Sequence, residues 1–190
     1  MRNQPLALPH GMPAAMEWRH GYDRRHRHAT PRLGRYTIDA HDSSLSFTSR
    51  HLFGLLPVRG AFAIRGGTVD VAEPLSGSRV RAEIDAVSFR TGNAQRDAAV
   101  RSAKFLDTDR YPLMLFVSDQ LDATAVTGTL TVCGVSRPAR LSLVHREVLA
   151  DAFTVRATTR VDRTEFGVTA SRGMAGRHLD LTLEIRCRRV

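Results

Sequence analysis

The repeated alternation of apolar and polar residues along most of the chain is the feature that most limits its fold. Residues 79–86 (RVRAEIDA) place four apolar side chains on one face and four charged side chains on the other. The same period of two recurs in residues 126–132, 153–161 and 179–187. Such a period is typical of a strand with one buried face. We expect about eight or nine antiparallel strands, arranged either as two packed sheets or as a closed barrel.

Glycine-rich turns and one change of parity mark the connections between these strands. The Gly-Gly pair at 66–67 predicts a hairpin, and GVS at 134–136 predicts another turn. The apolar positions change parity at Val87 and Phe89, which predicts a β-bulge there. Residues 113–117 (LMLFV) are apolar on both faces, which indicates a covered strand or a contact in a homodimer.

The segment Arg90–Pro112 is the one interruption of the strand pattern. Asn93 is placed to cap a short helix, and Asp97 and Arg101 are spaced to support its exposed side as an i,i+4 pair. The helix has to end before Pro112, because the residue before a proline is pushed out of the α region. A single helix inserted into an all-β chain is suited to closing one end of a barrel.

The inward-facing positions include several small residues, so a barrel interior need not be filled by side chains. An eight-stranded barrel is about the size that can hold one small ligand. The small residues predicted to face inward are Gly60, Ala82, Ala86, Gly128, Ala139 and Ala157.

Positive charge is concentrated in the first residues of the chain. The net charge is +9, and residues 1–35, with seven arginines and two acidic residues, carry +5 of it. We interpret residues 1–34 as a disordered basic arm and residues 35–190 as one folded domain. No apolar run has the length of a membrane span or of a signal-peptide core, so we expect a cytoplasmic protein without a transmembrane segment.

The basic arm leaves other functions open. The run RRHRHATPR at 24–32 could bind nucleic acid or an anionic membrane, and His20, His26 and His28 could hold a metal ion. Only Trp18 and Tyr22 are interleaved with the basic residues, which disfavours base stacking and sequence-specific recognition of nucleic acid.

Catalysis is a further alternative. A hydrolase could use His51 or His178 with a nearby serine, but the sequence has neither a G-x-S-x-G elbow nor an HExxH helix. We therefore expect no enzyme and no catalytic residues. The two cysteines, Cys133 and Cys187, lie in strand-like segments and are predicted to be free thiols; no metal site is expected in the folded domain.

Five motifs resemble the YceI-like family of polyisoprenoid-binding proteins, from Tyr36 to the C-terminus. They are YTIDAHDSSLSF, SRHLFGLLPVRGAF, TGNAQRDAAVRSAKFLDTDRYPLMLFVS, VTGTLTVCGVSRPARLSL and RTEFGV. The resemblance implies an eight-stranded antiparallel lipocalin-like β-barrel with one short helical insertion. It also implies an apolar interior that holds the tail of an isoprenoid lipid or quinone. Some family members are stress-related, and many are exported to the periplasm.

From these observations we expect non-enzymatic binding, storage or transport of such a lipid, with the lipid as ligand and no other cofactor. The head group is expected at a mouth formed by His51, Arg96, Arg101 and Arg163. The alternative is that these residues pin the helical insertion to the barrel by salt bridges. The residues predicted to line the cavity are Phe47, Phe62, Ile84, Phe89, Met114, Phe116, Leu130, Leu141, Phe153, Phe166 and Leu181.

Overall fold

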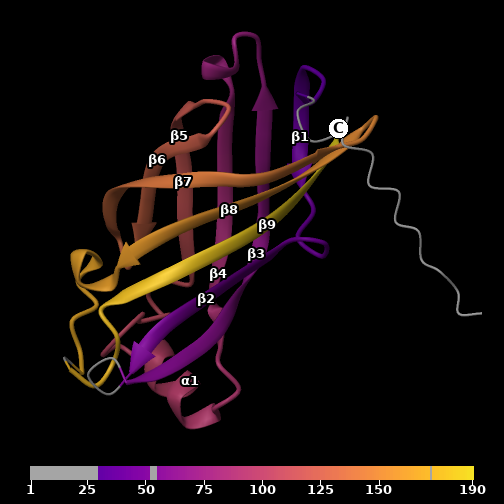
Figure 1. The fold of residues 1–190 in the computed structure, drawn as a ribbon. Coiled ribbons are helices and arrows are strands. Elements are labelled where there is room, and N and C mark those ends of the chain that lie inside the picture. The colour runs from indigo at the N-terminus through magenta and orange to yellow at the C-terminus, as the bar shows by residue number, and fades with distance from the viewer. Residues whose placement is uncertain (1–29, 52–54, 172) are drawn as a thin grey trace, which may run out of the picture.

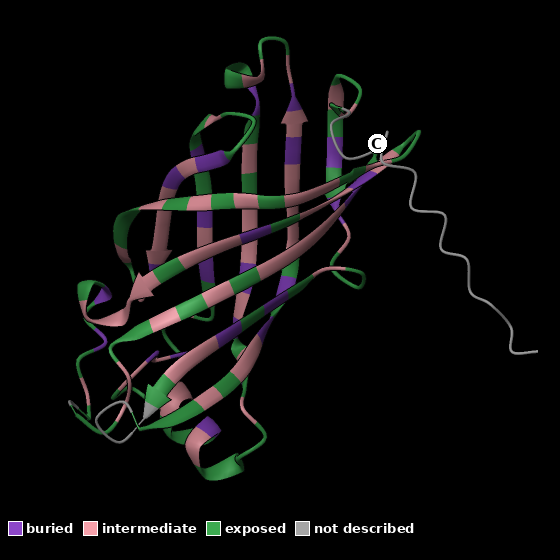
Figure 2. Cartoon of the chain, in the orientation of Figure 1, coloured by how far each residue is buried: buried purple, intermediate pink, exposed green. Residues whose placement is uncertain are grey.

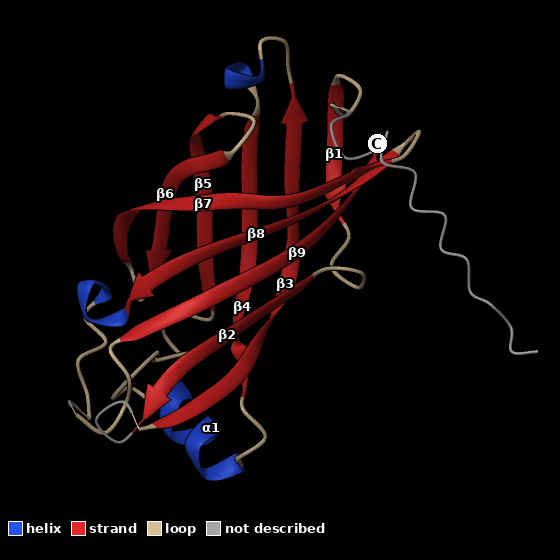
Figure 3. Cartoon of the chain, in the orientation of Figure 1, coloured by secondary structure: helices blue, strands red, loops and turns tan. Residues whose placement is uncertain are grey.

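A computed structural model describes residues 30–51, 55–171 and 173–190, except for the side chain of His51. Its strands are β1 (Gly34–Ile38), β2 (Ser44–His51), β3 (Leu56–Val71), β4 (Arg79–Arg90), β5 (Leu113–Leu121), β6 (Ala125–Val132), β7 (Val135–Val148), β8 (Ala152–Asp162) and β9 (His178–Arg189). The helices are α1 (Ala94–Arg101) and two short 3₁₀ turns, η2 (Leu75–Gly77) and η3 (Arg163–Phe166). Figure 1 shows that α1 lies at one end of the strands, and Figure 3 shows η2 at the opposite end.

The strands form one closed antiparallel barrel. The hydrogen-bonded order is β1-β3-β2-β9-β8-β7-β6-β5-β4, and the pairing of β3 with β4 closes the ring. Strands β1 and β2 both lie between β3 and β9, at different heights. They share one position in the wall, so the barrel has eight positions although the described residues contribute nine strands. This confirms the eight-stranded barrel with one helical insertion.

The strand faces follow the alternation in the sequence. Figure 2 shows exposed residues alternating with intermediate or buried ones along several strands, for example β9. Tyr36 on β1 is 1% exposed, and its ring meets that of Phe153 on β8 edge-on, with the ring centroids 5.0 Å apart. On β5, Met114 and Phe116 are buried, whereas Val117 is 38% exposed on the outer face. The outer face of β5 is therefore apolar but uncovered in this chain, and a homodimer contact there stays a prediction.

The Gly66-Gly67 pair does not form the predicted hairpin. It lies within the long strand β3, which pairs with β4 on both sides of a register shift between Ile64 and Gly66. Both glycines have a left-handed φ, +149° and +152°, and a Cβ on Gly67 would lie 2.1 Å from the carbonyl oxygen of Arg81. The pair therefore lets β3 bend and approach β4 closely. The hairpin prediction was wrong because a glycine pair permits a bend in a strand as well as a reversal.

The predicted bulge is present in β4. The β3–β4 register shifts between Ala61 and Ala63, which leaves residues 86–89 of β4 out of the ladder. Ser88 Oγ accepts a hydrogen bond from Ala63 N at 2.7 Å and so bridges this interruption. As a result Ala86 and Phe89 both face inward, while Val87 is 46% exposed. Val87 thus faces outward, contrary to the predicted parity.

Helix α1 begins as the sequence predicts, but one of its charged residues is placed differently. Asn93 Oδ1 accepts a hydrogen bond from Arg96 N at 2.9 Å and caps the helix. Asp97 was predicted on the exposed side, yet it is 7% exposed and accepts hydrogen bonds from Thr91 N at 2.9 Å and from Thr91 Oγ1. The carboxylate is buried because it holds the turn that joins β4 to the helix.

The end of the predicted arm lies against the barrel. Residues 1–29 lie outside the described residues. Tyr36 Oη donates a hydrogen bond to Arg32 O at 2.8 Å, and Arg189 Nη2 donates one to Leu33 O at 3.2 Å.

The described residues contain no helix that is both long enough and apolar enough to cross a membrane.

Candidate ligand-binding cavity

The barrel interior contains two adjacent chambers. The outer chamber, at the α1 end, has a volume of about 650 Å³. It is lined by residues of β2–β6, β8, β9, α1 and η3, and by loop residues that include Ser171 and residues 174–176. The inner chamber, toward η2, has a volume of about 170 Å³. Four residues line both chambers and form a waist between them: Leu45, Ile84, Leu130 and Leu181.

Three phenylalanines form one wall of the outer chamber. The ring centroids of Phe47 and Phe62 are 5.7 Å apart, those of Phe47 and Phe89 are 5.5 Å apart, and those of Phe62 and Phe89 are 5.3 Å apart. Gly60 makes room for this cluster, because a Cβ at that position would lie 2.3 Å from Phe47 Cζ. These rings give the chamber a rigid apolar surface.

The structure places all eleven residues predicted to line the cavity along one or both chambers. Phe47, Phe62, Phe89, Met114 and Phe166 line the outer chamber; Phe116, Leu141 and Phe153 line the inner chamber; and Ile84, Leu130 and Leu181 belong to the waist. Contact of these residues with a ligand stays a prediction.

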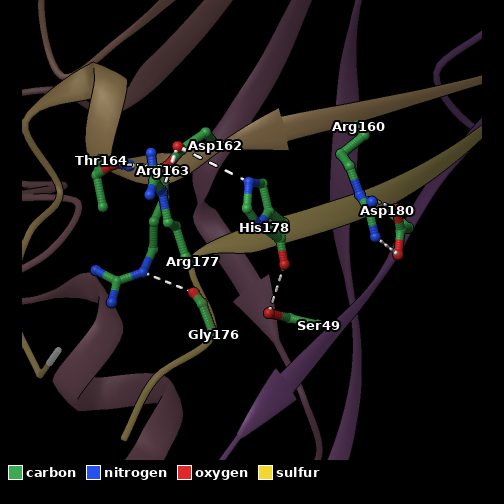
Figure 4. Close-up of polar contacts among 9 residues, drawn as sticks. All are labelled: Ser49, Arg160, Asp162, Arg163, Thr164, Gly176, Arg177, His178 and Asp180. Atoms are coloured by element: carbon green, nitrogen blue, oxygen red, sulfur yellow. Dashed lines mark hydrogen bonds and ion pairs between the residues drawn. The ribbon is translucent and has the colours of Figure 1, made fainter. Parts of the chain in front are cut away.

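Arg163 lies at the rim of the outer chamber and holds two loops together. It donates hydrogen bonds from Nε to Gly176 O at 2.8 Å, from Nη1 to Val168 O at 2.5 Å and from Nη2 to Ala175 O at 3.1 Å. Figure 4 shows the bond to Gly176. Burial lowers the pKa of the Arg163 guanidinium, and the nearby carboxylate of Asp162 partly opposes this effect. The arginine is therefore a partly desolvated cation bonded to neutral oxygens.

Arg96 also lines the outer chamber, whereas Arg101 does not. Arg96 is half-buried on the first turn of α1, and its Nε donates a hydrogen bond to Thr91 Oγ1 at 2.7 Å. Arg101 Nη1 instead donates to the carbonyl oxygens of Val87 and Phe89, each at 3.3 Å. These contacts pin the helix to the bulge of β4, so the structure does not bring Arg101 to the predicted mouth. The side chain of His51 lies outside the described residues.

Several rim residues were missed by the sequence reasoning. Arg50 and Ser49 from β2, Gln95 from α1, and Met174 and Gly176 from the loop before β9 line the outer chamber. The alternation of β2 placed Ser49 on the inner face, but nothing in the sequence marked the loop residues. They reach the chamber only because closure of the barrel brings β2, α1 and this loop to the same end.

The histidine predicted as a possible catalytic base is not hydrogen-bonded to a serine through its ring. Ser49 Oγ donates a hydrogen bond to the backbone carbonyl of His178 at 2.8 Å, as Figure 4 shows. His178 Nε2 lies 3.9 Å from Asp162 Oδ2. A nucleophile activated by a base requires a hydrogen bond between the two side chains. The hydrogen bond of Ser49 to the backbone of His178 therefore supports a structural role for Ser49.

The two cysteines do not form a disulfide, and the possible metal ligands of the described residues do not form a cluster. Cys133 and Cys187 are both free, and burial raises the pKa of Cys187 to about 12. Within residues 30–51, 55–171 and 173–190, no three His, Cys, Asp or Glu side chains come together as a metal site. The histidines of the basic arm, His20, His26 and His28, lie outside the described residues.

A lateral opening interrupts the wall between β7 and β8. The β7–β8 ladder reaches only Ser142 and Thr158, and the two strands diverge beyond this pair (Figure 1). A cavity of about 570 Å³ lies at the gap and is lined both by outward residues such as Arg140 and by lumen residues such as Thr159. Leu130 and Leu181 of the waist also line it. Backbone hydrogen bonds between β7 and β8 therefore do not close the barrel wall at this gap.

Comparisons with known proteins agree with this architecture. The family of YceI-like domains matches residues 36–187. A UPF0312 protein of Pseudomonas putida (strain GB-1) is 30% identical over 128 residues, which cover 62% of this chain and 66% of that protein, just under two thirds of its length. A UPF0312 protein of Shewanella baltica is 29% identical, over 79% of this chain and 85% of that protein.

Two solved structures share the fold. A polyisoprenoid binding domain from Saccharophagus degradans has a TM-score of 0.65 at 16% identity, covering 84% of this chain and 100% of that domain. BcnA of Burkholderia cenocepacia has a TM-score of 0.64 at 20% identity, covering 78% of this chain and 98% of that one. At these identities the likeness establishes the barrel fold alone.

Proposed function

The chain belongs to the family of YceI-like domains, and from this premise we propose that it binds an isoprenoid-type lipid or quinone in its lumen and stores or carries it without chemical change. The observation that carries the proposal is the pair of apolar chambers joined at the waist, with polar side chains gathered on the rim of the outer one. The polyisoprenoid-binding fold neighbour supports the choice of tail.

The physical basis is burial of a long apolar tail. A ligand tail leaving water gains about 25 cal/mol for each Å² of apolar surface that it buries. The outer chamber, at about 650 Å³, is within the range of pockets that enclose most of a small amphiphile. A branched, unsaturated tail matches a lumen walled by phenylalanine, leucine and isoleucine side chains, while the head group would face the rim residues Arg96 and Arg163.

The test is to identify what the full chain carries when purified from its native host. Organic extraction and native mass spectrometry should recover a prenyl chain in stoichiometric amount. A protein that stays empty and does not bind an added polyprenol would contradict the proposal.

The basic arm is tested separately by deleting residues 1–29, which keeps the hydrogen bonds of Arg32 and Leu33 with the barrel. Because the predicted lining residues lie in the barrel, lipid binding should survive the deletion, whereas any salt-sensitive binding to nucleic acid or anionic vesicles should be lost. Cytoplasmic location, the absence of other cofactors and a homodimer likewise stay predictions.

A further inference from the structure

The charged residues that line the outer chamber all have the same sign. They are Arg50, Arg96 and Arg163, and no Asp or Glu of the described residues lines this chamber. An apolar cavity with a wholly cationic rim is complementary to an amphiphile whose polar end is an anion. This inference rests on the proposed function and specifies its ligand.

Two carboxylates beside the rim arginines, those of Asp97 and Asp162, accept hydrogen bonds from other groups. Burial raises the pKa of Asp97, but hydrogen bonds from Thr91 and the charges of Arg101 and Arg96 outweigh it and lower the pKa. Asp162 accepts hydrogen bonds from Thr164 N at 2.9 Å and from Arg177 Nε at 2.6 Å. Figure 4 shows Asp162 beside Thr164 and Arg177. Each acid thus lies near one rim arginine, but its hydrogen bonds come from other groups: those of Asp97 from Thr91, and those of Asp162 from Thr164 and Arg177.

Arg96 and Arg163 are held in place by neutral acceptors. The described residues contain no carboxylate within ion-pair distance of Arg96, whose Nε and Nη2 donate to the hydroxyl and carbonyl oxygens of Thr91 at 2.7 and 3.4 Å. Arg163 donates to three carbonyl oxygens. A guanidinium carries five N–H donors, so each arginine keeps donors for a ligand.

Both guanidinium groups are therefore positioned before a ligand arrives. Groups that are fixed in advance lose little entropy on binding, and charge-assisted hydrogen bonds to an oxyanion are about twice as strong as bonds between neutral groups. A neutral quinone or alcohol would receive hydrogen bonds here but would not gain the attraction between an anion and the guanidinium groups.

We propose that the outer chamber selects an amphiphile with an anionic head group, a phosphate or carboxylate on a long apolar tail, over a neutral alcohol or quinone with the same tail. Arg96 and Arg163 bind the anion at the rim, and the tail passes the phenylalanine wall toward the waist.

The experiment measures the affinity of the full chain for a polyprenyl monophosphate and for the polyprenol of the same length. The phosphate should bind at least about tenfold more tightly, and this preference should shrink as salt is raised. A fatty acid and its alcohol, compared in the same way, show whether the site accepts any oxyanion or requires phosphate; an anion preference in either pair supports the proposal.

The variant Arg96→Gln should weaken binding of the phosphate more than binding of the polyprenol, so that the preference for the phosphate falls, and Arg96→Lys should restore part of this preference. The matched control is Arg156→Gln, which removes one positive charge from the exposed Arg156–Glu184 pair on the barrel wall, away from the outer chamber.

Equal affinity for phosphate and alcohol would overturn the anion selection and leave the lipid-binding proposal standing. A preference that falls equally in Arg96→Gln and Arg156→Gln would also overturn it, because the effect would then come from net charge. If neither lipid binds, the proposed function itself fails.

Discussion

The two ends of the lumen use polar residues differently. At the inner end, Asp122 Oδ1 accepts hydrogen bonds from Thr124 N at 2.6 Å and Ala125 N at 2.8 Å, and Arg146 Nη2 donates one to Ala123 O at 2.9 Å. These hydrogen bonds stabilise the turn between β5 and β6. At the outer end, Arg96 and Arg163 are also bonded to the chain, but they line the larger chamber with no acidic counterpart on its wall.

This difference gives the lumen a direction. An amphiphile that entered with its head toward the inner chamber would place a polar group against mostly apolar walls, which costs free energy unless the group is hydrogen-bonded. The arrangement therefore favours a ligand with its tail inward and its head at the outer rim. A short tail would fill only the outer chamber, whereas a long tail would pass the waist and reach the inner chamber.

Of the changes we predict, blocking the waist should have the largest effect, and the effect is on ligand affinity. Leu130→Trp places a bulky ring where both chambers meet, so affinity for a long polyprenol should fall by about a hundredfold, or ~3 kcal/mol. A short prenyl chain that fits the outer chamber should lose much less. The control is Val144→Trp on the outer face of β7, where Val144 is 55% exposed. Unchanged binding of the long chain to Leu130→Trp would show that the inner chamber is not used.

The inner end should also be sensitive to the backbone geometry of β3. Gly67→Ala puts a Cβ 2.1 Å from Arg81 O at a φ of +152°, so the free energy of unfolding should fall by about 2 kcal/mol. Gly77→Ala is the matched control, because the nearest atom to its Cβ is 3.5 Å away. Chemical denaturation measures both variants. Equal stabilities would mean that β3 does not depend on this bend.

The lateral opening should give water-soluble reagents access to the lumen residues beside it. In a Cys133→Asn background, Thr159→Cys should react with a water-soluble thiol reagent about tenfold faster than Val155→Cys. Thr159 pairs only with β9, whereas Val155 pairs with both β7 and β9. Asn is chosen because Cys133 has a φ of +50°. Similar rates would indicate that the gap is closed in solution.

The smallest effect is expected from a change of pH, which alters the free energy of unfolding through Asp162, the residue before Arg163. Burial raises the pKa of Asp162, but hydrogen bonds from Thr164 and Arg177 outweigh it and lower the pKa to about 2. An unfolded Asp titrates near ~3.9, so this stabilisation is present above about pH 4 and is lost as the pH falls toward 2.

Asp162→Asn should therefore lower the free energy of unfolding by about 1 kcal/mol at pH 7, and the difference should narrow between about pH 4 and pH 2. The exposed pair of Arg160 and Asp180 provides the control, since Asp180→Asn should change stability by less than about 1 kcal/mol. Denaturation curves across this pH range measure both. A pH-independent loss in Asp162→Asn would contradict the assigned cause.

Local patterns in the chain were enough to predict the lumen wall. A period of two assigns each residue of a strand to one face, and the cap at Asn93 is a contact between close neighbours in sequence. The inner faces of β8 and β9 and all eleven predicted lining residues followed from such patterns together with the family motifs.

Tertiary structure decided the features that depend on distant segments. Whether the 66–67 glycines reverse or bend the chain depends on the pairing of β3 with both β1 and β4. Arg96 and Arg101 lie on the same short helix, and only the docking of α1 against β4 places one at the chamber and the other on the bulge. The rim likewise needs closure of the barrel, because β2, α1 and the loop before β9 are far apart in sequence and no local period links them.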